Sequence, residues 1–293
     1  DIDRDIRKSI MVAGTARSGT TWLANIIASQ IPCRLMFEPF QSKMVKAFSQ
    51  FHYFHYMRPS EQNDELWSYC RKVFTGDIKH NWVDRKVDQI FPSYRLIKEI
   101  RANLFLQWLH RMFPEVPLLF IIRHPCAVVL SRMRLVWATD TDIEPFLSQS
   151  KLVDDFLGDK IDIIRGAKTV EEKHAIIWSI TNLVPLKQFG PNGLNLIFYE
   201  NLALQPEVEI PKIFQIIRQE YQASVFKVIE KPSTTTVQTS AIITGHNQIT
   251  GWKKKLSPQQ IDNILSIVAD FELDHIYGDS FEPLVTTLSE DKA

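Results

Sequence analysis

The chain has 293 residues, of which 45% are hydrophobic and 23% are charged. Its 34 Lys and Arg residues balance its 34 Asp and Glu residues, which argues against a nucleic-acid-binding or membrane-surface protein, because such proteins carry a strongly basic face. The longest apolar run, Val116–Ile122, is too short to span a membrane and nothing resembles a signal peptide, so we expect a cytoplasmic protein.

Apolar segments of strand length alternate with segments of helical periodicity along the chain. We expect strands at Ile10–Ala13, Leu35–Phe37, Arg95–Ile97, Pro117–Ile122 and Leu194–Phe198. We expect helices directly after the first strand and at Asn103–Phe113, Val170–Phe189, Pro206–Glu220 and Gln259–Phe271. Strands that are apolar on both faces predict an α/β fold of the P-loop type, with three layers: a central parallel sheet and helices on both of its faces. No linker divides the sequence, which predicts a single domain over residues 1–293.

The segment Ser9–Ile27 has the layout of a phosphate-binding loop between a strand and a helix. Gly14 and Gly19 have the spacing of the motif G-x-x-x-x-G-K-[ST], but Thr20 replaces its lysine and the cation is Arg17. This pattern predicts a site for a phosphate-like group that lacks the usual contacts to a γ-phosphate and Mg²⁺. The candidate contacts are Arg17, Ser18, Gly19, Thr20 and Thr21, with the face of Trp22 available to a purine.

A second anion site is predicted at Phe120–Arg132. The strand ends in Arg123, where an ATPase of the P-loop class often has an aspartate that holds Mg²⁺. Pro125 is suited to open a helix, and Ser131 lies eight residues after Arg123 in that helix. Because arginine is suited to bidentate phosphate recognition, Arg123 and Ser131 predict a site for a second phosphate.

A third candidate is Thr244–Leu256, where two glycines flank polar residues and precede Trp252 and three lysines. Such a segment can wrap around a nucleotide and place cations on its phosphate. The alternative is a solvated basic run before a helix. The candidate nucleotide contacts are Gly245, Gly251, Trp252 and Lys253.

Together these features resemble the sulfotransferases that use 3′-phosphoadenosine 5′-phosphosulfate (PAPS). Four segments match the family, and they occur in its typical order over roughly residues 9–270. They are the phosphosulfate loop Gly14–Trp22, the 3′-phosphate pair Arg123 and Ser131, the tyrosine–acid–x–leucine segment in Phe198–Leu202, and the glycine–tryptophan–lysine loop Gly245–Lys253. The resemblance implies that Tyr199 contacts the nucleotide, that PAPS is the co-substrate and adenosine 3′,5′-bisphosphate the product, and that no metal is needed.

The chain departs from the cytosolic branch of that family at three places. Arg17 stands where the cytosolic branch usually has lysine, and His124 replaces the Asp or Asn that commonly follows the strand-end arginine. Leu96–Ile100 contains no histidine where that branch has its Lys-Thr-His triplet. The chain is therefore more similar to the bacterial and carbohydrate-type branches.

The implied reaction is in-line sulfuryl transfer to an acceptor oxygen or nitrogen. Arg17 and the loop N–H groups are suited to stabilise charge on the transferring group, and Lys98 to approach the bridging oxygen. The first candidate for the general base is Glu38, because Pro39 ends the strand and turns its carboxylate toward the cleft; Glu99, His52 and His55 are alternatives. The three cysteines form no C-x-x-C pair, and no cluster has metal-ligand spacing.

The acceptor is the least determined part of this prediction. We expect its pocket in Phe48–Met57, with His52 and His55, and in a helical insertion at about residues 139–166, with Asp140 and Asp142. Carboxylates at its edge would favour a polar or cationic acceptor, such as a hydroxylated or amine-bearing secondary metabolite. A carbohydrate acceptor is the alternative, and these acids could instead form a solvated face.

Two other functions share this fold. A P-loop small-molecule kinase would need a lysine after Gly19 and a carboxylate for Mg²⁺, and neither is evident. A non-catalytic nucleotide-binding protein would bind the bisphosphate and transfer nothing. The joint presence of Arg17, Lys98 and Glu38 favours an enzyme over this second alternative.

Overall fold

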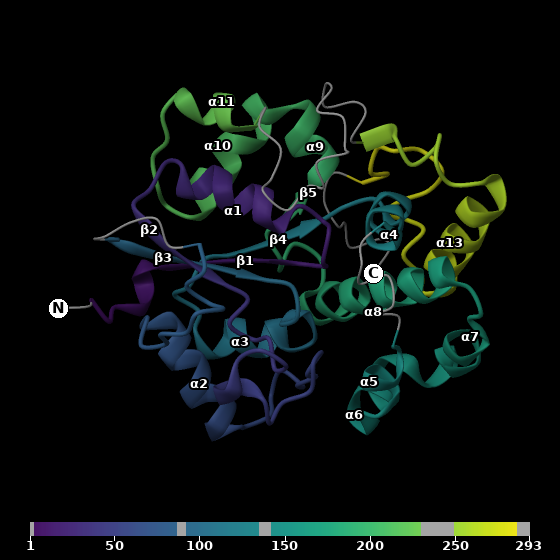
Figure 1. Cartoon of the computed structure of the whole chain (residues 1–293), viewed down its shortest axis with the longest axis horizontal. Helices are drawn as coiled ribbons and strands as arrows, with labels where there is room; N and C mark the ends of the chain where they lie inside the picture. The colour runs from purple at the N-terminus through teal and green to yellow at the C-terminus, as the bar shows by residue number, and fades with distance from the viewer. Residues whose placement is uncertain (1–2, 87–91, 135–141, 230–248, 286–293) are drawn as a thin grey trace.

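A five-stranded parallel sheet forms the centre of the molecule. The computed structural model describes residues 3–86, 92–134, 142–229 and 249–285, and the strand order is β2-β3-β1-β4-β5 (Figure 1). The strands are β1 (Ser9–Gly14), β2 (Cys33–Phe37), β3 (Tyr94–Glu99), β4 (Leu118–Ile122) and β5 (Leu196–Phe198). Every neighbouring pair runs parallel, so the five predicted strands and their parallel arrangement are confirmed.

The strand register brings three loops to one edge of the sheet. Val12 of β1 pairs with Lys98 of β3, and Lys98 pairs in turn with Phe37 of β2. The residues that follow these three strands therefore leave the sheet at the same edge. The strand order also reverses at β1, with β3 and β2 on one side of it and β4 and β5 on the other. Ligands of open α/β sheets bind at the carboxyl ends of the strands beside such a reversal.

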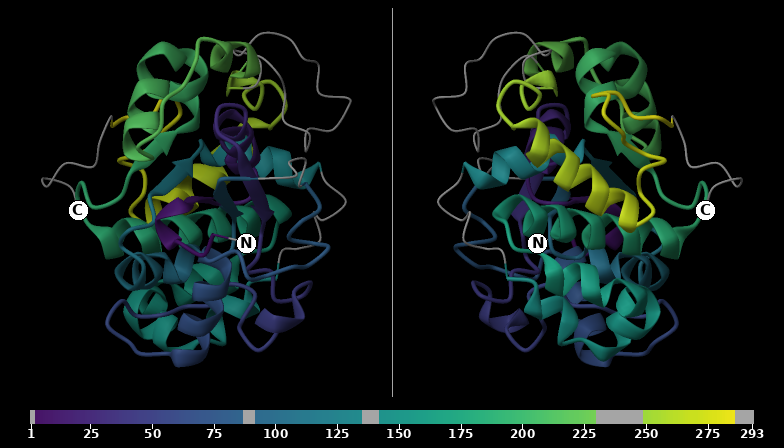
Figure 2. Two further views of the ribbon diagram at one scale, coloured as in Figure 1. Left: turned by 90° about the vertical axis from the view of Figure 1, so that its left-hand side faces the viewer. Right: turned by 90° about the vertical axis from the view of Figure 1, so that its right-hand side faces the viewer.

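Helices cover both faces of the sheet, as the sequence predicts. Figures 1 and 2 show α1, α9, α10 and α11 on one face, and α2, α3 and α8 on the other. The α-helices are α1 (Thr20–Ala28), α2 (Asp64–Phe74), α3 (Leu106–Met112), α4 (Pro125–Met133), α5 (Glu144–Leu147), α6 (Ser150–Leu152), α7 (Ile161–Gly166), α8 (Val170–Phe189), α9 (Tyr199–Leu204), α10 (Pro206–Ile216), α11 (Ser224–Ile229) and α13 (Pro258–Asp270). Short 3₁₀ or π turns are η1 (Ile6–Lys8), η2 (Lys46–Phe48), η3 (Asn103–Phe105), η5 (Val153–Leu157) and η6 (Gly158–Lys160).

The helix bounds follow local signals in the sequence. Helix α8 has the predicted bounds, whereas α10 ends at Ile216, before the predicted Glu220. The reason is Arg218, which adopts a left-handed backbone with φ of 56° and ends the helix. Along the described ranges, no helix combines the length and the apolar character needed to cross a membrane.

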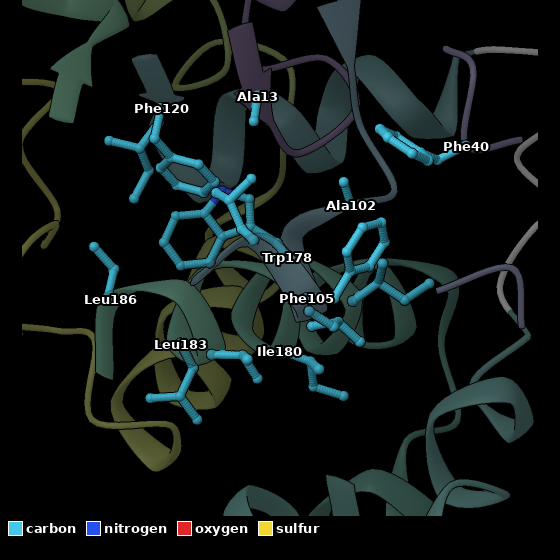
Figure 3. Packing of buried hydrophobic residues seen from close by; sticks show 14 of the residues in the cluster. Ala13, Phe40, Ala102, Phe105, Phe120, Trp178, Ile180, Leu183 and Leu186 are labelled. Atoms are coloured by element: carbon cyan, nitrogen blue, oxygen red, sulfur yellow. The ribbon is translucent and has the colours of Figure 1, made fainter. Parts of the chain in front are cut away.

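Alternate residues of the strands contribute to two separate hydrophobic cores. Val12 of β1 packs in the core shared with α1 and α10, whereas its neighbour Ala13 packs in the core shared with α3 and α8. Figure 3 shows Ala13, Phe120 and Trp178, from β1, β4 and α8, gathered in the second core. This alternation is what a sheet covered on both faces requires.

The long helix α8 supports the loops at the carboxyl edge of the sheet. It begins with a capping box, in which Glu172 N donates to the Thr169 hydroxyl at 3.3 Å and Thr169 N donates to the Glu172 carboxylate at 2.9 Å. Farther along, Trp178 Nε1 donates to the carbonyl oxygen of Arg123 at 3.1 Å. The hydroxyl groups of Thr181 and Thr15 are also hydrogen-bonded. Helix α8 therefore holds the residues that directly follow β1 and β4.

Replacing Thr169 with Ala should lower the free energy of unfolding by about 1 kcal/mol, because the variant loses the side-chain cap of α8. Urea denaturation followed by circular dichroism measures this change. Thr169→Ser keeps the hydroxyl and should stay close to the wild-type stability. An alanine variant as stable as the serine variant would show that the cap does not contribute.

Candidate active site

The loop after β1 makes a tight turn at the N-terminus of α1. Ser18 N donates to the carbonyl oxygen of Thr15 at 3.1 Å, and Arg17 and Gly19 have left-handed backbones with φ of 76° and 101°. A Cβ atom at Gly19 would lie 2.6 Å from the ring of Tyr199. This position therefore needs glycine both for its φ angle and for space. The turn has the layout of a helix N-terminal anion site.

The first two predicted anion sites meet in space. Arg17 Nε donates to Ser131 Oγ at 2.9 Å. Arg123 Nη1 donates to the carbonyl oxygen of Arg17 at 3.3 Å, and the Arg123 guanidinium lies 4.1 Å from the centroid of the Tyr199 ring. The guanidinium groups of Arg17 and Arg123 thus lie where four segments meet: the loop after β1, the end of β4, helix α4 and the start of α9.

The charges at this point favour a bound anion. Burial lowers the pKa of Arg17, and the positive charge of Arg123 lowers it further. An anion beside both guanidinium groups would offset their repulsion. The Ser18 hydroxyl oxygen is buried and has no hydrogen-bond partner within the part of the chain that the structure describes. A group with phosphate-like oxygens fits this combination of charges and donors.

Two aromatic rings lie beside the loop. The Trp22 and Tyr199 centroids are 5.0 Å apart and their planes are tilted by 52°. Trp22 Nε1 donates to the carbonyl oxygen of Ile229 at 3.4 Å. The tryptophan predicted to face a purine is therefore adjacent to the tyrosine that the family resemblance places on the nucleotide.

The third predicted anion segment differs from the expectation. Gly245 lies outside the described residues, and Gly251 is half-buried. Trp252 is 1% exposed and stacks on the ring of His124, with centroids 4.4 Å apart. Its indole therefore packs in the core and offers no free face to a nucleotide. Lys253 is exposed, with its Nζ 5.3 Å from the centroid of the Trp252 ring.

His124 supplies the helix cap that the family's Asp or Asn would provide. Cys126 N donates to His124 Nδ1 at 3.2 Å at the start of α4, so the imidazole proton is on Nε2, which donates to the carbonyl oxygen of Gly278 at 2.9 Å. Burial lowers the pKa of His124 to about 4, which keeps the ring neutral. Its backbone N donates to the Glu200 carboxylate at 3.0 Å.

Glu38 is held between two cations at the end of β2. Its Oε1 lies 2.5 Å from Lys98 Nζ, and its Oε2 lies 2.6 Å from Arg101 Nη1. Arg101 Nη2 also donates to the Tyr53 hydroxyl at 2.5 Å. Burial by itself would raise the pKa of Glu38, but the charges of Lys98 and Arg101 outweigh it and lower the pKa below its ordinary value. The structure thus brings the predicted Glu38 and Lys98 together, with the carboxylate ionised at neutral pH.

Sequence reasoning missed Arg101 and Tyr53. Arg101 follows β3 in the sequence Lys98-Glu-Ile-Arg, and residues that follow a parallel strand lie at the ligand-binding edge of the sheet. The position of Arg101 directly after β3 could therefore have identified it as a candidate site residue. The contact between Arg101 and Tyr53 joins segments 48 residues apart, and no local pattern encodes it.

Glu99 has a different role from Glu38. It is fully buried, and burial raises its pKa. Its two carboxylate oxygens accept hydrogen bonds from the backbone N atoms of Phe40 at 3.0 Å, Ile100 at 2.7 Å and Arg101 at 2.9 Å. These bonds tie together the loops after β2 and β3, which favours a structural role for Glu99.

His52 and His55, the other candidates for the base, are stacked and do not lie on a helix. Their centroids are 6.0 Å apart with an interplanar angle of 11°, and the chain forms no helix over residues 51–57. Burial lowers the pKa of His55 to about 4. Both nitrogens of His55 are buried and lack hydrogen-bond partners among the described residues. Tyr53, between the two histidines, is the residue that reaches the Glu38 cluster.

The two segments expected to form the acceptor pocket contact each other. Residues 144–166 are helical over most of their length. The rings of Phe54 and Phe146 stack with centroids 4.9 Å apart. The Gln149 side chain accepts from Tyr56 N at 2.8 Å and donates to the carbonyl oxygen of Phe54 at 2.7 Å. The insertion therefore packs on the aromatic segment that includes Tyr53.

Two acidic residues of the insertion, Asp142 and Asp155, have local partners. Asp142 is exposed, and its carboxylate accepts from Glu144 N at 3.0 Å. Asp155 forms an ion pair with Arg58 at 2.7 Å. Asp140 lies outside the described residues. Within the described ranges, no group of three or more His, Cys, Asp or Glu residues is arranged to hold a metal ion.

The fold is that of a parallel α/β protein, and two arginines converge on the loop after its first strand. The chain belongs to the sulfotransferase family: a model described as "Sulfotransferase family" matches residues 9–223. This family comprises PAPS-dependent enzymes.

Individual relatives are distant. Nodulation protein NoeE of Sinorhizobium fredii is 22% identical over 223 residues, which are 74% of this chain and 52% of that protein; the chain thus spans about half the length of that relative. The sulfotransferase domain from the curacin biosynthetic pathway has a TM-score of 0.50 and 15% identity, covering 89% of this chain and 96% of that domain. The sulfotransferase domain of the Synechococcus PCC 7002 olefin synthase has a TM-score of 0.47 and 14% identity, covering 90% and 94%. The likeness to the curacin domain shows that the fold is sulfotransferase-like.

Acidification should destabilise the chain through its buried histidines. An unfolded histidine takes up a proton near pH 6.5, whereas His124 in the fold does so near pH 4. Between these values the unfolded state binds more protons, so the free energy of unfolding falls as the pH falls. The loss attributable to His124 over this range is roughly 3 kcal/mol.

Urea denaturation at pH 7.5 and pH 4.5 measures this effect. His124→Gln should lose less stability on acidification than the wild type. His275→Gln, in a half-exposed position, serves as the control and should follow the wild type. An unchanged pH dependence in His124→Gln would contradict the assignment of a buried neutral ring.

Proposed function

We propose that this chain is a sulfotransferase that moves a sulfuryl group from PAPS to a hydroxyl or amine of a small polar acceptor. The observation that carries the proposal is the convergence of Arg17, Arg123 and Ser131 beside the loop after β1. Phosphate-like groups are the ligands that such a cluster of guanidinium and hydroxyl donors at a helix N-terminus recognises.

The donor site would divide between the two motifs. The loop Arg17–Thr21 would bind the phosphosulfate, and Arg123 with Ser131 the 3′-phosphate. Trp22 and Tyr199, whose rings are in contact, would border the adenine. Gly251 and Lys253 remain candidates for the 3′-phosphate side, whereas the burial of Trp252 supports an indirect role through His124.

In the proposed reaction, the acceptor oxygen or nitrogen attacks sulfur in line while the bond from sulfur to the phosphate oxygen breaks. The acceptor proton passes to the Glu38 carboxylate, and the leaving phosphate retains the electron pair. Lys98 is suited to stabilise charge on the bridging oxygen, since Lys98 pairs in register with both β1 and β2. Arg101 would hold the Glu38 carboxylate in position, because it contacts the oxygen that Lys98 does not.

A kinase function is less well supported. Thr20 stands where a nucleoside triphosphate site has lysine, and the residue that follows β4 is Arg123 rather than a carboxylate. Both replacements favour an anion whose recognition does not use the lysine and the Mg²⁺ carboxylate of a nucleoside triphosphate site. The proximity of Glu38 and Lys98 likewise supports an enzyme over a protein that only binds the nucleotide.

Adenosine 3′,5′-bisphosphate should raise the melting temperature more than ATP with Mg²⁺, because ligand binding stabilises the folded state by mass action. Gly19→Ala should abolish most of this shift, since its Cβ would collide with Tyr199 and its φ would be strained. Gly166→Ala, whose added Cβ would meet no other atom within 4 Å, is the control and should keep the shift. A larger response to ATP and Mg²⁺ would favour the kinase.

Glu38→Gln should lower the rate of sulfate transfer by about 10²–10⁴-fold and leave bisphosphate binding intact, because it removes the proposed base. The rate is measured with labelled PAPS and any acceptor that the wild type sulfates in a panel of hydroxyl and amine compounds. The exposed Glu65→Gln is the control. A Glu38→Gln variant that binds the bisphosphate and keeps more than about a tenth of the wild-type rate would contradict the assignment.

A further inference from the structure

Two further cations lie on aromatic rings that belong to the surroundings of Glu38. The Arg85 guanidinium lies 3.6 Å from the centroid of the Phe37 ring and 4.0 Å from that of the Trp82 ring. Lys43 Nζ lies 4.4 Å from the centroid of the Tyr53 ring. Both cations are exposed, and among the described residues neither forms an ion pair. We call Lys43 and Arg85 the basic patch.

The basic patch belongs to the surroundings of Glu38. Tyr53, which lies beneath Lys43, accepts a hydrogen bond from Arg101, and Arg101 contacts Glu38. Phe37, which lies beneath Arg85, directly precedes Glu38 in the chain and is also 4.5 Å from Lys98 Nζ. Two aromatic rings next to the Glu38 cluster thus each support an exposed cation.

The charge near Glu38 is positive even though the whole chain is neutral. The single charge of Glu38 is already shared by Lys98 and Arg101, at 2.5 and 2.6 Å. Glu99 uses its oxygens to bind backbone N–H groups. Among the described residues, this cluster therefore has four cations, Lys43, Arg85, Lys98 and Arg101, for the two carboxylates of Glu38 and Glu99.

The position of the patch separates it from the donor site. Arg85 packs on the last residue of β2, the edge strand, and β3 lies between β2 and β1. The loop that would bind the phosphosulfate follows β1. Arg85 therefore lies at the end of the strand that leads into Glu38, with β3 between it and that loop, and an acceptor that approaches the proposed base from β2 would meet the patch.

We propose that the acceptor carries a negative charge near its reacting group and that Lys43 and Arg85 bind this charge. The inference rests on the proposed sulfotransferase function and specifies its substrate class. Ammonium and guanidinium groups recognise carboxylates, sulfate esters and phosphate esters alike. It reverses the expectation of a cationic acceptor that the acidic insertion suggested, because Asp155 is paired with Arg58 and the Asp142 carboxylate accepts a hydrogen bond from Glu144 N.

Matched sugars test the proposal. Glucuronic acid, glucose 6-sulfate and glucose 6-phosphate share the ring of glucose but carry a carboxylate, a sulfate or a phosphate. Titration calorimetry is carried out on the full chain saturated with adenosine 3′,5′-bisphosphate, so that the donor site is filled. At least one of the anionic sugars should bind about tenfold more tightly than glucose, and the strongest of the three identifies the kind of anion.

Lys43→Ala combined with Arg85→Ala should reduce that preference to within about twofold. Lys72→Ala combined with Arg111→Ala removes the same charge from exposed positions elsewhere and should preserve it. Equal binding of all four sugars to the wild type, binding of none, or a preference that survives in the Lys43/Arg85 variant would each overturn the proposal. Bisphosphate binding is measured first, and its absence would count against the proposed sulfotransferase function. If the bisphosphate binds normally, any of the three outcomes above counts against the acceptor proposal alone.

Discussion

The site depends on the parallel pairing of β1 with β3 and β4. Parallel strands release their following residues at one edge, so this pairing brings together the loop after β1, the cations after β3 and Arg123 after β4. The hydrogen bond from Arg17 to Ser131 then fixes the loop against α4. Helix α8 supports the same edge from below through Thr181 and Trp178. Without this strand register, the side chains of Arg17, Lys98 and Arg123 would not lie at the same edge of the sheet.

Glu38 illustrates a compromise between orientation and basicity. Two cations fix both oxygens of the carboxylate, which limits its rotamers and directs it to one place. The same cations lower its pKa and so weaken it as a base, since proton affinity and pKa fall together. A buried carboxylate without these partners would be the stronger base but would lose its ionisation and its fixed position. The site therefore favours positioning over proton affinity.

Local patterns were sufficient to predict the strands, the long helix α8 and the tight glycine-bounded loop after β1, because periodicity, caps and glycine spacing are encoded within short segments. The pairing of Arg17 with Ser131 was not predicted, although both residues were singled out separately. Arg101 and Tyr53 were missed, because their contact spans distant segments. For Trp252 the local pattern was misleading. A tryptophan beside lysines suggested a nucleotide contact, but the ring packs against His124, which is distant in the sequence. The residues 230–248, which include Gly245, are not described by the structure.

His124 contacts residues that lie beyond the part of the chain matched by the family model. The family match ends at residue 223, but His124 stacks on Trp252 and donates to the carbonyl oxygen of Gly278. Tyr277 donates to Glu200 at 2.7 Å, and Glu200 in turn accepts from the backbone of His124. A chain cut at the family boundary would expose this buried carboxylate and leave the α4 cap unsupported, immediately beside Arg123. The segment beyond that boundary thus supports the start of α4 and the turn at Arg123, although the family match does not include it.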